Sequence, residues 1–74
     1  IIVMVEVFST NITCPLAART VLQKIRENFP DYRVNFDLED CDKILRVESL
    51  SAIAKEKIYL LIANQGYKAE VLPD

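Results

Sequence analysis

The chain has 74 residues, 51% of them hydrophobic, and its nine basic and eleven acidic residues give a formal net charge of -2. This length predicts one domain, residues 1–74, and the hydrophobic share excludes a disordered chain. The slight negative charge argues against nucleic acid as a partner, and the lack of histidine in the sequence removes imidazole both as a metal ligand and as a general base.

The first thirty residues predict a strand followed by a helix. Val3, Val5 and Val7 recur at every second position, so residues 1–8 are expected to form a strand with an apolar valine face. Pro15 suits the first position of a helix. The helix is expected to end at Asn28 or Phe29, before Pro30, and its apolar stripe comprises Ala18, Val21, Leu22, Ile25 and Phe29.

The rest of the chain predicts two strands, a second helix and a last strand. Residues 33–39 alternate between polar and apolar, and a turn near 40–42 leads to a short strand in which Leu45 and Val47 share one face. A second helix is expected from a cap at Ser49 or Ser51 to a stop at residues 65–66. Residues 67–71 alternate again, as expected of a strand.

This order, βαββαβ, predicts an α+β ferredoxin-like sandwich. With right-handed crossovers it gives a four-stranded antiparallel sheet of order 4-1-3-2, with both helices on one face. On the open face we expect an exposed apolar strip, partly masked by charged neighbours such as Glu6 and Arg46. The strip comprises Ile2, Met4, Phe8, Ile44 and Leu72. It is either an ordinary open face or the surface for a protein partner or a dimer.

Residues 11–17 read Asn-Ile-Thr-Cys-Pro-Leu-Ala at the expected junction of the first strand and helix, and Ile62 precedes Gly66-Tyr67-Lys68-Ala69 near the end. With the element order, these segments resemble the heavy-metal-associated domain family of copper chaperones and metal-pump N-termini. Its loop reads Gly-Met-x-Cys-x-x-Cys and its closing segment Ile-x-x-x-Gly-Tyr-x-Ala. The resemblance implies that Cu(I) or another soft metal ion would be held between two thiolates.

The loop departs from the family pattern at the second thiol. Cys14 occupies the first cysteine position, whereas Ala17 occupies the second and cannot bind a metal. The other loop residues that differ from the pattern or fill its variable places are Asn11, Ile12, Thr13 and Pro15. Asn11 replaces glycine and predicts a changed loop conformation, because asparagine tolerates φ > 0. A two-thiol site within the loop is therefore excluded.

Three functions stay open for a domain of this kind. Metal handling would need Cys14 together with Cys41, a second molecule or glutathione as the other thiol donor. Cys14 and Cys41 are expected at the same rim of the sheet, at a separation marginal for a disulfide, which makes them a candidate redox pair. The third function is protein recognition without metal. We expect no enzymatic activity, because the sequence shows neither a nucleophile beside a base nor a glycine-rich phosphate loop.

The sequence also carries an expectation about location. It has no run of the 18 or so apolar residues that a membrane-spanning helix needs, and segment 1–5 lacks the basic flank of a signal peptide. Two cysteines in a chain without the features of a secreted protein are more typical of free thiols than of a structural disulfide. We therefore expect a cytoplasmic protein with no membrane partner.

Overall fold

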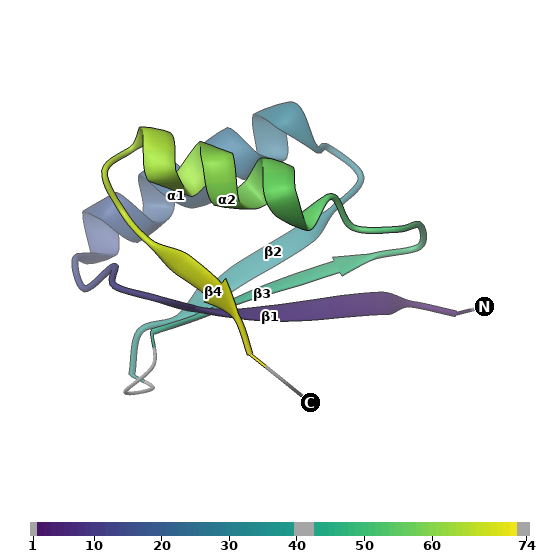
Figure 1. The fold of residues 1–74 in the computed structure, drawn as a ribbon, viewed down its shortest axis with the longest axis horizontal. Helices are drawn as coiled ribbons and strands as arrows, with labels where there is room; N and C mark the ends of the chain where they lie inside the picture. The colour runs from purple at the N-terminus through teal and green to yellow at the C-terminus, as the bar shows by residue number, and fades with distance from the viewer. Residues whose placement is uncertain (1, 40–42, 73–74) are drawn as a thin grey trace.

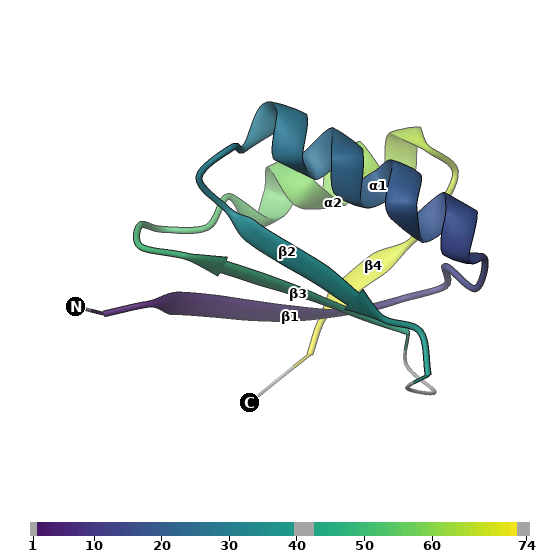
Figure 2. The same ribbon diagram turned by 180° about the vertical axis from the view of Figure 1, so that it is seen from behind.

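The computed structural model describes residues 2–39 and 43–72. Its elements in chain order are β1 (Met4–Thr10), α1 (Pro15–Asn28), β2 (Arg33–Asp37), β3 (Ile44–Ser49), α2 (Lys55–Asn64) and β4 (Ala69–Val71). The strands form one sheet of order β2-β3-β1-β4 with antiparallel neighbours. Both helices cover the same face (Figure 1, Figure 2). The predicted ferredoxin-like fold and strand order are confirmed.

Helix α1 forms where its apolar stripe predicted it. Cys14 is the N-cap with an extended backbone, and Pro15 takes the first helical position, where the missing N–H group costs no hydrogen bond. The stripe residues Ala18, Val21 and Ile25 are buried against the sheet. Arg26 lies in the last turn, where a cation complements the helix dipole.

Helix α2 begins later than predicted. It starts at Lys55 rather than near the two serines, because Ser49 is buried at the end of β3 and its Oγ accepts a 3.1 Å hydrogen bond from Ser51 N. This local turn uses the serine oxygen before the helix begins. Within the described ranges, neither α1 nor α2 is long and apolar enough to span a membrane.

The end of α2 agrees with the sequence. Gly66 has φ +89°, and its N–H donates to the Ala63 carbonyl at 2.9 Å, while Tyr67 N–H donates to the Ile62 carbonyl at 3.2 Å. These two bonds form a Schellman cap, in which glycine supplies the left-handed residue. The cap turns the chain back toward β4.

The core lies between the helices and one face of the sheet. On the sheet side it is formed by Phe8, Leu45 and Val47, all fully buried. The Phe8 ring meets the Tyr59 ring of α2 edge to face, with centroids 5.6 Å apart and an interplanar angle of 87°. Phe8 therefore joins β1 to α2.

The face of β1 that packs against the helices is the opposite of the predicted one. Phe8 and Glu6 lie opposite Leu45 and Val47, whose side chains are buried, so the even-numbered residues of β1 face the helices. Val5, by contrast, is 47% exposed. The valine face is thus the open face.

This reversal corrects the predicted apolar strip. Phe8 is 0% exposed and cannot belong to an exposed surface. Ile2 and Met4 are exposed, but alternation places them on the same side as Phe8. The N-terminal end of β1 extends beyond the part of the sheet that the helices cover (Figure 1). Ile44 alternates with buried Leu45 and so lies on the open side of β3, whereas Leu72 follows the end of β4; both are half-buried.

Candidate functional site

The first half of loop 11–17 is tied into the fold. The Asn11 Oδ1 atom accepts a 2.8 Å hydrogen bond from Lys68 N–H, and Asn11 N–H donates to the Lys68 carbonyl at 3.3 Å. Asn11 does not adopt a positive φ; among the described residues other than glycine, only Lys43 does. Asn11 thus acts through its side-chain acceptor and does not need a left-handed backbone.

Two further contacts fix this end of β1. Ile12 is 0% exposed, and its N–H donates to Thr10 Oγ1 at 3.2 Å. The Thr10 hydroxyl in turn donates to the Lys43 carbonyl at 2.7 Å, which joins the end of β1 to the start of β3. Ile12 is therefore a core residue. In the loop that resembles the metal-binding family, Ile12 therefore has a structural role.

The second half of the loop carries the thiol. Cys14 is exposed as a free thiol, and no side-chain hydrogen bond caps the helix at this residue. Thr13 and Pro15 beside it are also exposed. Ala17, at the position of the second cysteine in the resemblance, is half-buried and packs against the core. The loop presents one sulfur to solvent and a methyl group where a second sulfur would be needed.

These residues do not fit an intramolecular soft-metal site. A two-coordinate thiolate site needs two sulfurs, and the loop offers one. Within 2–39 and 43–72, no three or more side chains of His, Cys, Asp or Glu lie close enough together to hold an ion. Cys41 lies outside the described residues, so its pairing with Cys14 stays a prediction.

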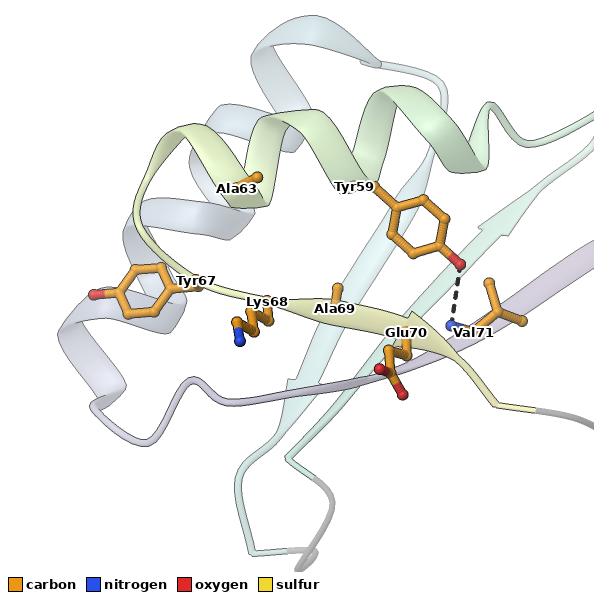
Figure 3. Close-up of a pocket in the computed structure, with 7 residues that line it drawn as sticks. All are labelled: Tyr59, Ala63, Tyr67, Lys68, Ala69, Glu70 and Val71. Atoms are coloured by element: carbon orange, nitrogen blue, oxygen red, sulfur yellow. Dashed lines mark hydrogen bonds between the residues drawn. The ribbon is translucent and has the colours of Figure 1, made fainter.

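A groove runs between α2 and the outer edge of β4 (Figure 3). It has a volume of about 540 Å³ and its lining includes Tyr59, Ala63 and Ala69. The Tyr59 hydroxyl accepts a 3.1 Å hydrogen bond from Val71 N–H, as the dashed line in Figure 3 shows. Lys68 and Glu70 do not converge with Tyr59 on a common point (Figure 3). The groove lacks the clustered polar groups of a small-molecule site. The Tyr59 hydroxyl accepts the hydrogen bond of the Val71 N–H group, which points away from β1, so this backbone donor at the edge of β4 already has a partner.

At the other edge of the sheet, a backbone group of β2 also has a side-chain partner from a helix. The Arg26 guanidinium of α1 donates through Nη2 to the Val34 carbonyl of β2 at 3.4 Å. Exposed Arg33 and Asn35 flank this position on the strand. Side-chain partners and charges of this kind discourage another strand from adding to an edge.

Among the described residues, none protects the N-terminal part of β1 on the side of β4. The β1–β3 register covers Met4–Phe8, whereas the β1–β4 register covers only Phe8–Thr10. Toward its N-terminus β1 extends past β4 with an uncovered side (Figure 1). Four consecutive apolar residues are exposed there: Ile2 79%, Val3 50%, Met4 44% and Val5 47%. We call Ile2–Glu6 the free β1 segment.

The described residues therefore hold two candidate functional features at opposite ends of β1. One is the single exposed thiol of Cys14, and the other is the free β1 segment. Sequence reasoning found the first from the loop. It missed Val3 and Val5 in the second, although their alternation was visible. Comparison with protein-family models and with curated proteins finds no match to this chain.

Proposed function

We propose that this chain is a non-enzymatic protein-recognition domain, built like a heavy-metal-associated domain but without a metal site inside one molecule. The observation that carries the proposal is the free β1 segment, in which four consecutive apolar side chains are exposed and one side of the strand pairs with no described strand. Exposed apolar surface on a strand edge favours pairing with another protein strand.

The loop supports the second half of the proposal. Asn11 and Ile12 stabilise the fold through the Lys68 contacts and core burial, so the loop has a structural reason to exist without a metal. A lone exposed thiolate holds a soft ion weakly, because its affinity depends on a second sulfur donor. A reducing, cytoplasmic location is part of the proposal, since Cys14 carries a free thiol.

A Cu(I) titration against a competing chelator separates recognition from metal handling. The protein is kept dilute and reduced, and the chelator reports the copper that it loses. We expect no stoichiometric capture by the natural chain and no difference in the Cys14→Ser variant. The matched positive control is Ala17→Cys, which returns a sulfur to the second thiol position and is expected to capture about one Cu(I) per monomer.

One result would contradict this proposed function directly. If the dilute natural chain takes up one Cu(I) per molecule and loses it on Cys14→Ser, the loop is a metal site despite Ala17. Capture that also requires Cys41, tested by Cys41→Ser, would instead establish the displaced dithiol site that the sequence left open.

A further inference from the structure

We propose that the free β1 segment binds the same segment of a second copy of this chain, and that the two strands pair antiparallel about a twofold axis at Met4. This inference rests on the proposed function and names its partner. It follows from the direction of the backbone groups, the length of the free segment and the side chains that would meet.

The backbone groups of Val3 and Val5 point to the unprotected side of β1. Leu72 N–H donates to the Val7 carbonyl at 2.8 Å, so Val7 directs its polar groups toward β4. Residues two apart on a strand point the same way, so Val3 and Val5 also face that side. Beside them, no described strand pairs with β1 on this side. Their N–H and C=O groups are therefore available to an added strand.

The position of β4 and the described part of the segment set the register. Because Leu72 N–H already donates a hydrogen bond to the Val7 carbonyl, an added strand can lie beside β1 only up to Glu6. Within the described residues, the available stretch is Ile2–Glu6, which is centred on Met4. A second copy running antiparallel uses the whole stretch when Met4 lies opposite the partner's Met4. Val3 then exchanges backbone hydrogen bonds with the partner's Val5, and Val5 with the partner's Val3.

The side chains that meet in this register are compatible. On the open face Val3 packs against the partner's Val5, and on the other face Met4 packs against the partner's Met4. Glu6 lies opposite the partner's Ile2, at the rim, so no like charges are directly opposed. Moving the twofold axis by two residues, from Met4 to Glu6, would oppose Glu6 to the partner's Glu6, which is unfavourable. It would also collide with β4 at Val7.

The small size of the segment predicts a weak dimer. Five residues a side are far fewer than the 20–30 of a standard interface, which places the contact in the weak, transient class. We expect a dissociation constant on the order of 100 μM, for which dilution separates the copies. Apolar contacts and backbone hydrogen bonds depend little on salt, and screening of the net charge favours association at higher ionic strength.

Sedimentation velocity over a concentration series, with reductant and chelator present, tests the proposal. A rise from monomer to dimer between about 10 μM and 1 mM is expected. Val5→Pro removes the Val5 N–H, which faces the unprotected side and not β3, so it should leave the fold intact and weaken the dimer at least tenfold. Val5→Lys adds a charge at the same place and should act alike. Leu60→Lys, at a 63% exposed position on α2, is the matched control and should leave the dimer unchanged.

A disulfide cross-link tests the register. In a background with Cys14→Ser and Cys41→Ser, Met4→Cys should form a cross-linked dimer rapidly under mild oxidation, because residues at a non-hydrogen-bonded pair have Cα atoms about 4.5 Å apart. Ile2→Cys should cross-link at least tenfold more slowly, because position 2 lies opposite the partner's Glu6, which is four residues from position 2 of the partner. Equal rates would overturn the register.

The outcomes distinguish this inference from the proposed function. A chain that stays monomeric at 1 mM, or a dimer that survives both Val5→Pro and Val5→Lys, overturns pairing with a second copy. A dimer lost on Cys14→Ser would be held by the thiol and also overturns it. None of these results changes the Cu(I) titration of the dilute monomer, which alone decides whether the loop is a metal site.

Discussion

Replacing Phe8 with alanine is expected to destabilise the domain severely. The Phe8 side chain is 0% exposed and meets Tyr59 edge to face across the core. Removal of a buried phenylalanine costs about 3–5 kcal/mol, because transfer energy is lost and a cavity remains. For a 74-residue domain the total stability is about 4–11 kcal/mol. Phe8→Ala should therefore remove about a quarter or more of the stability and can unfold the chain outright.

Val5 on the same strand gives the matched comparison. Val5→Ala removes two methyl groups from a side chain that is 47% exposed. At about 0.8 kcal/mol per fully buried carbon, roughly half burial gives a loss of about 0.8 kcal/mol. The two variants should thus differ by about 2–4 kcal/mol. A strand with its valine face toward the helices would give the reverse order.

The assay is denaturant unfolding followed by far-ultraviolet circular dichroism, at a few micromolar protein so that association does not contribute. Equal m-values in the natural chain and Val5→Ala would validate the comparison of their free energies of unfolding. A Phe8→Ala chain that is unfolded without denaturant, while Val5→Ala stays folded, agrees with the expected order. A loss at Val5 as large as that at Phe8 would refute the assignment of the two faces.

Three further predictions concern single contacts. Gly66→Ala should cost about 1–2 kcal/mol through its left-handed backbone alone, since no atom lies within 4 Å of an added Cβ; an unchanged Tm would contradict this. Asn11→Ala should lose about 1 kcal/mol of unfolding free energy, because Lys68 N–H loses its acceptor, and an Asn11→Gly variant that is as stable as the natural chain would show that the side chain is dispensable. Tyr59→Phe keeps the ring against Phe8 but frees Val71 N–H, so it should cost about 1 kcal/mol and speed amide exchange at Val71; unaltered exchange there would argue against the hydrogen bond.

The element order and most of the core could be predicted from the sequence, because helical and strand periodicity specify them. Ala18, Val21 and Ile25 share a helix stripe, and Leu45 and Val47 share a strand face, as expected. The start of α2 could not be predicted, since a serine that suits a helix cap also suits the local turn it makes here.

The orientation of β1 could not be settled locally. Both faces of residues 2–8 are apolar apart from Glu6, so alternation alone does not choose between them. The choice is made by Leu45 and Val47 of β3, which lie opposite Phe8 and Glu6 and carry the buried face across the sheet. This information is nearly forty residues away in the sequence.

The candidate site was predicted in part. The exposed thiol of Cys14 at the start of a helix is confirmed. The role of Asn11 was not foreseen, because its partner, Lys68, lies 57 residues further along the chain. The free β1 segment depends on the register of β4 against β1. The strand ends at Val71, as its alternating pattern indicated, but Val71 lies opposite Phe8, and this long-range pairing is not specified by the local sequence.

Amide hydrogen exchange along β1 tests the central claim most directly, namely that its N-terminal part is an unprotected strand edge available to a partner. In a dilute sample we predict slow exchange at Glu6, which faces β3, and fast exchange at Val3 and Val5, which face no described strand. At millimolar concentration Val3 and Val5 should become protected while Glu6 changes little. Slow exchange at Val5 in the dilute sample would contradict the account, because that edge would already be occupied within one molecule.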